Sequence, residues 1–235
     1  AWLSMRTALQ LLAITGLMTL ASAAHCALPP DMDKRTAACT VCHGDQGRAT
    51  ADGYYPRIAG KPAGYLLEQL RSFRDRRRVH DQMASLLAFQ TDEYLRDMAE
   101  YFAQLKIPYP SPSSSPRDTL SLRRGAILIQ QGDGERDIPA CIACHGEKLT
   151  GLQPAVPGLL GLPYDYLVAQ MGAWREGLRR SREPDCMAHI ARSLSRQDID
   201  SLAAWLSAQV VPESAMAPEG QINSNLRCGS LDVEP

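Results

Sequence analysis

The sequence predicts an all-α protein made of two similar repeats in tandem. Aromatic residues form only 6% of the 235 residues, and the clusters of Val, Ile and Tyr that favour strands are missing. Apolar residues recur at helical spacing in several segments. Short stretches of the first part of the chain also return, in the same order, in the second part. With 45% hydrophobic residues, the chain can bury a sizeable core.

Residues 1–24 are predicted to be a secretory signal peptide. Met5 is the expected start, Arg6 supplies the positive charge, and residues 9–20 are mostly apolar. The small residues at 21–23 fit a cleavage site. We therefore expect a cleaved, exported protein in the periplasm, with a retained N-terminal anchor as the alternative. The formal net charge of −1 gives no indication of nucleic-acid binding.

Each repeat contains the pattern Cys-x-x-Cys-His. The two copies are Cys39, Cys42 and His43, and Cys141, Cys144 and His145. Two thiols at this spacing can bond to the two vinyl groups of a haem, and the adjacent His can then bind the iron. A redox dithiol does not need that His, and a zinc site would need further ligands. We therefore expect two covalently bound c-type haems.

The first repeat is expected to be a domain over residues 25–107. A short polar segment at 31–38, with at most two helical turns, leads into the first motif. A turn and a loop follow as far as Pro56. Residues 65–78 have the apolar spacing of a helix, whereas residues 79–90 are less regular. Thr91 can cap a last helix, whose apolar stripe is Leu95, Met98, Ala99 and Phe102.

Residues 108–118 are rich in Pro and Ser and are predicted to be a semi-rigid linker. The second domain is expected over 119–211 and begins with a helix at 120–131. Several of its residues match the first repeat: Pro157 to Pro163 match Pro56 to Pro62, Tyr166 matches Tyr65, and Gln170 matches Gln69. Ser195 and Asp198 form a capping box for its last helix. Residues 212–235 are expected to lie over this domain as a tail or to fray.

A haem iron held by His needs a second axial ligand. Met98 and Met171 align with leucines on core stripes, and Met216 lies in the tail. Met83 and Met187 remain, in matching segments just before the last helix of each repeat. We predict that both bind iron, since a thioether is a neutral, soft ligand that raises the reduction potential.

Other side chains compete for these roles. His80 and His189 lie near the two methionines but not at equivalent positions, so we expect both on the surface. Cys186 can be a thiolate ligand, pair with Cys228, or stay a buried thiol. Cys26 and Cys228 lie near the two ends of the mature chain and are also candidates for a disulfide.

Two further pairs of residues are expected near the haems. The carbonyl groups of Pro56 and Pro157 follow the motif histidines at similar spacing and can accept the imidazole N–H. Arginines are dense at 71–78 and 175–182. Some can pair with haem propionates, although most are expected on a solvated face.

These residues resemble the cytochrome c4 family of dihaem periplasmic electron carriers, over about residues 33–210. The resemblance rests on both C-x-x-C-H-G motifs, on P-R-I-A-G-K-P-A-G-Y-L-L-E-Q-L at 56–70, and on the pattern P-x-[IL]-x-G-x-P-x-x-Y-L-x-x-Q in both repeats. It implies two class I cytochrome c domains related by a pseudo-twofold axis, with His/Met ligation at both irons. It also implies that Arg78 and Arg179 match the family's arginine before the methionine loop. Arg76 stands where the family usually has Gly.

The resemblance implies an electron-transfer protein and no enzyme. It would pass single electrons from a quinol-oxidising complex or dehydrogenase to an acceptor such as an oxidase, free in the periplasm or peripheral to the membrane. Two alternatives remain: a dihaem subunit of a flavoprotein sulfide dehydrogenase, and a dihaem enzyme, either a peroxidase or a thiosulfate-oxidising cytochrome. Cys186 is the one hint of the last. The sequence leaves open the potentials, the partners and the oligomeric state.

Overall fold

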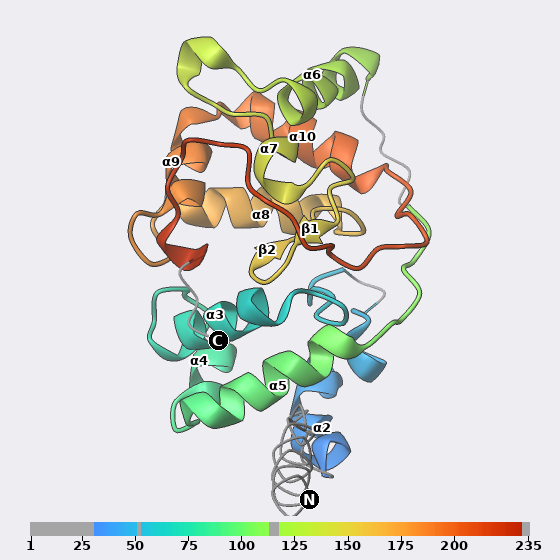
Figure 1. The fold of residues 1–235 in the computed structure, drawn as a ribbon, viewed down its shortest axis with the longest axis vertical. Helices are drawn as coiled ribbons and strands as arrows, with labels where there is room; N and C mark the ends of the chain where they lie inside the picture. Colours follow the sequence, from blue (N-terminus) through green and yellow to red (C-terminus); the bar gives the residue numbers. More distant parts are fainter. Residues whose placement is uncertain (1–30, 51–52, 113–117, 232–235) are drawn as a thin grey trace, which may run out of the picture.

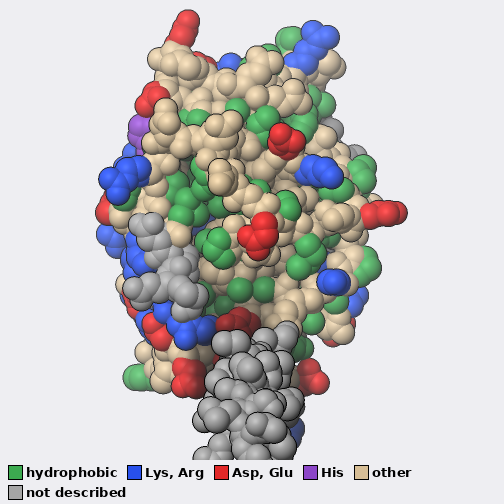
Figure 2. All heavy atoms as spheres, viewed as in Figure 1, with side chains coloured by type: hydrophobic (Ala, Val, Ile, Leu, Met, Phe, Trp, Pro, Cys, Tyr) green, Lys and Arg blue, Asp and Glu red, His purple; other side chains and the backbone are tan. Residues whose placement is uncertain are grey.

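The computed structural model describes residues 31–50, 53–112 and 118–231. It is a helical structure in which the two repeats stack on one another, joined by an extended connection along one side (Figure 1). The predicted signal peptide and Cys26 lie outside the described residues. Side chains of both charge signs lie on the face shown in Figure 2, consistent with a net charge close to zero.

The first repeat has four α-helices in its described part: α2 (Met32–His43), α3 (Ala63–Arg74), α4 (Asp81–Leu87) and α5 (Asp92–Gln104). A short 3₁₀ turn, η1 (Asp45–Gly47), follows the first motif. Helix α3 packs on α5, and their apolar faces meet in a core that includes Leu66, Leu67, Leu95 and Phe102. Helix α2 is longer than expected, because it continues through the first motif to His43.

The described part of the second repeat has five α-helices: α6 (Thr119–Gln130), α7 (Ile142–His145), α8 (Tyr164–Arg175), α9 (Cys186–Ser193) and α10 (Arg196–Ser207). Two 3₁₀ turns, η2 (Gly134–Arg136) and η3 (Gly229–Leu231), lie in its loops and tail. A small antiparallel hairpin, β1 (Gly151–Leu152) and β2 (Val156–Pro157), follows the second motif and was not expected. Helix α10 packs against both α6 and α8.

The segments before the last helix of each repeat are helical, so the prediction of irregular structure there was wrong. Each short helix begins with a side-chain cap. His80 accepts a hydrogen bond from the backbone N–H of Met83 at 3.5 Å, and Asp185 accepts one from Ala188 at 3.0 Å. A cap satisfies backbone donors that a helix start leaves free, which stabilises a helix too short to show a clear period.

The expected caps of the two last helices are confirmed. The Thr91 hydroxyl accepts a hydrogen bond from the backbone N–H of Tyr94 at 3.2 Å. At the start of α10, Ser195 and Asp198 each accept a hydrogen bond from the other's backbone N–H, both at 3.0 Å. These local patterns set where both helices begin.

Helices α6 and α10 cross at Gly125. A Cβ atom at this position would lie 2.3 Å from the carbonyl oxygen of Ser201 and 2.8 Å from the Cβ of Trp205. One turn away, the hydroxyl groups of Ser121 and Ser201 lie 3.1 Å apart. The absence of a side chain at Gly125 therefore allows the two backbones to approach.

The tail lies over the second repeat. The backbone N–H of Gln153 donates to the carbonyl of Pro218 at 2.9 Å, and that of Asn223 donates to the carbonyl of Ala143, inside the second motif, at 2.8 Å. A disulfide then joins Cys186 to Cys228. The expected Cys26–Cys228 pair is therefore wrong, and so is thiolate ligation by Cys186, because its sulfur is already bonded.

Arg76 ends the turn after α3 with φ of 59°, and its counterpart Gly177 has φ of 71°. A side chain is disfavoured in this left-handed conformation, whereas Gly adopts it freely. The Arg76–Asp81 ion pair offsets little of this backbone strain, since the two side chains are 60% and 88% exposed.

We therefore expect Arg76→Gly to raise the free energy of unfolding by about 1 kcal/mol. Urea unfolding followed by circular dichroism would measure it. The matched variant Gly177→Ala should lower the same quantity by a similar amount. A loss of stability in Arg76→Gly would show that the contacts of the Arg76 side chain outweigh the strain of its backbone.

Candidate haem sites

The two motif histidines are held in the same way. The Nδ1 atom of His43 lies 2.8 Å from the carbonyl oxygen of Pro56, and that of His145 lies 2.8 Å from the carbonyl oxygen of Pro157. Since a carbonyl can only accept, each Nδ1 carries the proton, which leaves the Nε2 lone pair free to bind a metal. Both imidazoles are buried, and burial lowers the pKa of each, which keeps them neutral.

The chain turns sharply after each motif. Gly44 has φ of 76° and Gly146 has φ of 80°, and a Cβ at Gly44 would lie 2.4 Å from the carbonyl oxygen of Ala49. The backbone N–H of Ala49 in turn donates to the carbonyl of His43 at 2.8 Å. These turns carry the chain from each His toward the proline loop that orients it.

The four motif cysteines form no disulfide within the described chain: Cys39, Cys42, Cys141 and Cys144. Burial raises the pKa of Cys141 to about 12 and also raises those of Cys39 and Cys144. A redox dithiol instead needs a thiol pKa lowered by its surroundings. No group of three or more His, Cys, Asp or Glu suited to a metal ion occurs among the described residues. The thiols therefore fit thioether attachment better than dithiol or zinc chemistry.

Met83 and Met187 occupy equivalent places. Met83 lies in α4 and packs, half-buried, against the core of the first repeat. Met187 lies in α9 and packs against a cluster formed by Trp174, Ala188 and Ala191. Of the rival ligands, His189 is largely exposed, whereas His80 is partly buried and caps α4 with its ring nitrogen. The expectation that His80 is a plain surface residue was therefore wrong.

Arg78 and Arg179 meet where the repeats stack. Their backbones form an isolated antiparallel bridge, and the backbone N–H of Val79 donates to the carbonyl of Leu178 at 2.7 Å. Each guanidinium donates to the glutamine of its own repeat and to the glutamine and tyrosine of the other. The Arg78 bonds are to Gln69 (2.9 Å), Gln170 (2.6 Å) and Tyr166 (3.1 Å), and the Arg179 bonds are to Gln170 (2.8 Å), Gln69 (2.9 Å) and Tyr65 (3.4 Å).

This arginine network has the symmetry of the repeat, but its acceptors are all neutral. The Arg78 guanidinium also lies 4.5 Å from the ring centroid of Phe73, and that of Arg179 lies 3.8 Å from that of Trp174. The Nε1 of Trp174 is buried without a hydrogen-bond partner within the described structure. Two cations and an unpaired N–H thus lie together, which fits an anionic group such as a haem propionate. The repeat aligned these residues, but it gave no sign that they join the two halves.

Other arginines have protein partners. Arg71 and Arg74 both pair with Asp92, at 2.7 and 2.6 Å. Arg182 reaches across the repeats to the buried Glu68 at 3.1 Å. The charges of Arg71, Arg74 and Arg182 are thus paired with carboxylates of the protein. Arg78 and Arg179, whose acceptors are neutral, are better suited to bind a further anion.

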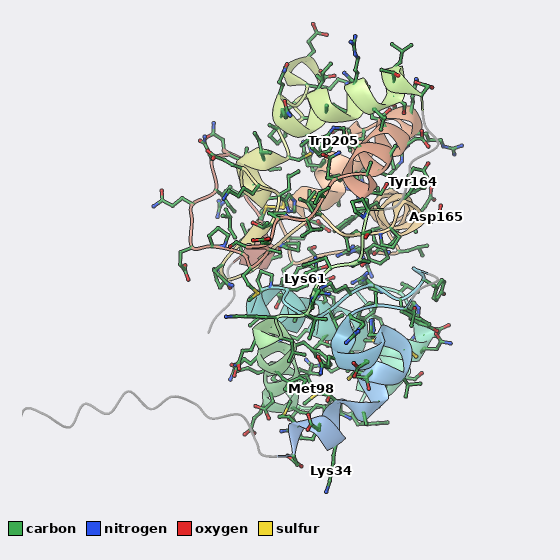
Figure 3. All side chains as sticks on the ribbon, turned by 90° about the vertical axis from the view of Figure 1, so that its right-hand side faces the viewer. Lys34, Lys61, Met98, Tyr164, Asp165 and Trp205 are labelled. Atoms are coloured by element: carbon green, nitrogen blue, oxygen red, sulfur yellow. A yellow bond between two sulfur atoms is a disulfide. The ribbon has the colours of Figure 1, made fainter. Side chains whose placement is uncertain are left out.

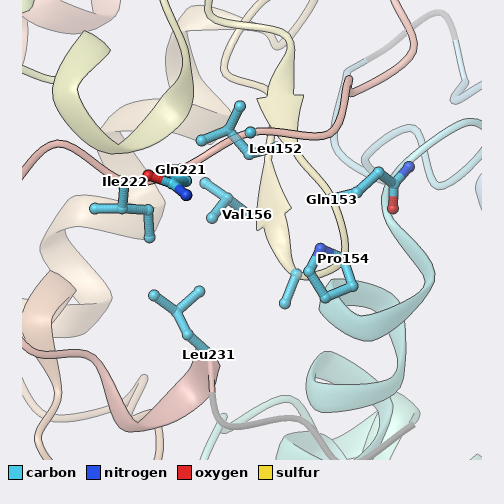
Figure 4. Close-up of a pocket in the computed structure, with 9 residues that line it drawn as sticks. Leu152, Gln153, Pro154, Val156, Gln221, Ile222 and Leu231 are labelled. Carbon is cyan, nitrogen blue, oxygen red and sulfur yellow. The ribbon is translucent and has the colours of Figure 1, made fainter.

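A shallow depression lies between the hairpin and the tail (Figure 4). It is lined on one side by Leu152, Pro154 and Val156 and on the other by Ile222 and Leu231. Neither the motif cysteines nor His145 line it. The depression therefore reflects how the tail rests on the hairpin.

Comparison with known proteins identifies the family. No protein-family model matches the chain. The "Thiosulfate dehydrogenase electron acceptor" of Thiomonas intermedia is 33% identical over 88% of this chain and 93% of its own length. Cytochrome c4 of Pseudomonas aeruginosa is 32% identical over 73% of this chain and 84% of its own length. The chain belongs to the cytochrome c4 family.

The solved structures agree with this assignment. Reduced recombinant cytochrome c4 from Pseudomonas stutzeri superposes with a TM-score of 0.64 at 28% identity, over 74% of this chain and 95% of that one. Thiosulfate dehydrogenase (TsdBA) from Marichromatium purpuratum gives a TM-score of 0.67 at 30% identity, over 76% of this chain and 40% of that one.

Membership of the cytochrome c4 family confirms two predictions. The fold is two tandem class I cytochrome c domains, and the protein carries two covalently bound c-type haems. It also makes the chain a dihaem electron-transfer protein at the level of the family. Among the described helices, none has the length and apolar character needed to cross a membrane.

Proposed function

We propose that this cytochrome c4 is a periplasmic carrier of single electrons, with His43 and Met83 as axial ligands of one iron and His145 and Met187 as those of the other. The observation that carries the proposal is the matching placement of both histidines through Nδ1, with a methionine on the equivalent short helix of each repeat. Each haem, when bound, cycles between ferric and ferrous iron.

The protein's own residues would set the conditions for this cycle. The proline carbonyls hold the imidazoles in one tautomer, and burial keeps water from the ligands. Arg78 and Arg179 would neutralise propionates where the repeats meet, with Trp174 as a further donor. Because both arginines lie where the repeats meet, propionates bound to them would bring the two haems toward each other at this interface.

For the donor, we propose a thiosulfate-oxidising dehydrogenase. Two relatives that carry the name thiosulfate dehydrogenase electron acceptor are 33% and 35% identical to this chain over 93% and 78% of their lengths. An oxidase would then receive the electrons. The disulfide removes Cys186 as a thiolate ligand, and with it the one sequence feature that favoured a thiosulfate-oxidising enzyme. A role as subunit of a sulfide dehydrogenase is the alternative.

Rapid mixing tests the proposed function. The oxidised dihaem protein should stay oxidised with thiosulfate alone and become reduced once a thiosulfate dehydrogenase is added. Reduction by thiosulfate alone would show that the chain is itself the enzyme. Reduction only by sulfide with a flavoprotein would favour the subunit alternative.

The axial methionines can be tested one at a time. Met83→Ala and Met187→Ala should each open one of the two irons, because alanine cannot bind metal. We expect each variant to bind carbon monoxide at one haem and to lose part of the methionine–iron charge-transfer absorption. Met98→Leu is the matched control, since Met98 is a buried core residue whose repeat counterpart is Leu202. An unchanged spectrum in either alanine variant would exclude that methionine as a ligand.

A further inference from the structure

Lys61 is a buried cation at the boundary between the two repeats. It comes just before Pro62, the N-cap of α3, and is only 5% exposed. Figure 3 labels it where the two repeats meet. Its ammonium group donates to the carbonyl oxygen of Gly158 at 3.2 Å. Gly158 follows Pro157, whose carbonyl holds the imidazole of His145. A lysine of the first repeat thus reaches the loop that orients the second iron ligand.

The ammonium keeps its charge at neutral pH. Burial lowers the pKa of Lys61 to about 8, and the nearby charge of Arg57 acts in the same direction. The Arg57 guanidinium has partners of its own. It donates to the carbonyls of Ala59 and Pro108 and lies 4.0 Å from the Tyr109 ring centroid. No carboxylate of the described residues pairs with Lys61. Its charge is therefore not cancelled by a neighbouring anion.

Lys61 lies beside one of the two sites. Its ammonium contacts Gly158, the residue after Pro157, and so lies on the loop whose carbonyl holds the imidazole of His145. The repeat itself breaks here, because the residue that matches Lys61 is Leu162. Lys61 is therefore a feature of one haem site and not of both.

We propose that Lys61 raises the reduction potential of the haem bound at His145, so that the first repeat sets the electron affinity of the second. Ferric iron carries one more positive charge than ferrous iron. A fixed positive charge in a poorly polarisable interior disfavours the ferric form. Lys61 acts through this field and does not bind the iron. The inference rests on the proposed function only in that His145 is an iron ligand.

Redox titration of the dihaem protein tests this role. Lys61→Met and Lys61→Gln remove the charge, while Lys61→Arg keeps it. In both neutral variants the haem at His145 should be oxidised more readily. The equilibrium constant for electron transfer between the two haems should therefore change by about tenfold. The haem at His43 should keep its potential, and Lys61→Arg should stay close to the parent protein. Lys148→Met, which removes an exposed charge three residues after His145, is the matched control.

Met83→Ala and Met187→Ala each change one haem, so the potential that shifts in each variant is assigned to that haem. Unchanged potentials in Lys61→Met and Lys61→Gln would overturn the proposal, and so would equal shifts at both haems. A shift in Lys61→Arg as large as that in Lys61→Met would also overturn it, since packing and not charge would then be the cause. If Met83 or Met187 does not bind iron, the absorption spectra of its alanine variant would show it. The proposed ligands and the proposed role of Lys61 are therefore tested by different measurements.

Discussion

Gly125→Val is expected to destabilise the second repeat by about 3 kcal/mol, close to the upper range for overpacking a well-packed contact. The valine side chain would begin 2.3 Å from the carbonyl oxygen of Ser201, which is backbone and cannot move by rotating a bond. Helices α6 and α10 would have to separate, and the core around Leu128, Leu202 and Leu206 would open. Denaturant unfolding of the haem-loaded protein, followed by circular dichroism, would measure the loss.

Gly172→Ala is the control for this prediction. Gly172 lies inside α8, and a Cβ there would meet nothing within 4 Å. Because Ala is the better helix former, this variant should gain up to about 1 kcal/mol. Both variants add a side chain to a helical glycine, and the space around each Cβ gives their expected effects opposite signs. A Gly125→Val protein with nearly unchanged stability would show that the helices can slide apart at little cost.

Removal of the disulfide is expected to cost about 3 kcal/mol, since Cys186 and Cys228 close a long loop whose ends are otherwise free in the unfolded chain. The two residues are 42 positions apart in sequence. Cys228→Ser should therefore lower the free energy of unfolding by that amount. It should also loosen Met187, the residue after Cys186, which would appear as easier binding of carbon monoxide at one haem.

Reductant provides the control for the disulfide. With the haems of both proteins already reduced by ascorbate, dithiothreitol should lower the stability of the parent protein to that of Cys228→Ser and should leave the variant unchanged. An equal effect of reductant on both proteins would mean that the measured loss does not come from reduction of the Cys186–Cys228 disulfide. Equal stability of parent and variant would show that the hydrogen bonds of the tail hold it in place alone.

Local patterns explain what the sequence predicted well. Thr91 and Ser195 begin their helices as expected, because a cap depends on residues only three positions apart. The carbonyls of Pro56 and Pro157 accept hydrogen bonds from the imidazole Nδ1–H groups, as the spacing indicated. The five residues of each Cys-x-x-Cys-His motif predict haem attachment. The repeat then predicts which methionine and which proline belong to each site.

The features that sequence reasoning missed depend on contacts between distant residues. The sequence offered the pairing of Cys186 with Cys228 as one of several alternatives, and only the path of the tail, which has no periodic pattern, decides for it. The hydrogen bonds from Arg78 to Gln170 and from Arg179 to Gln69 require the two repeats to be stacked. Lys61 was overlooked because its importance comes from burial against Gly158, in the other repeat.

The path of the tail also gives the molecule an open end and a closed end. Asn223 binds the backbone of Ala143, between the cysteines of the second motif, whereas the matching residue of the first motif, Val41, is 82% exposed. Within the described chain, Val41 is therefore open to solvent, whereas the tail lies over the second motif at Ala143. If the protein works as the carrier proposed above, a redox partner would meet fewer tail residues at the first motif than at the second.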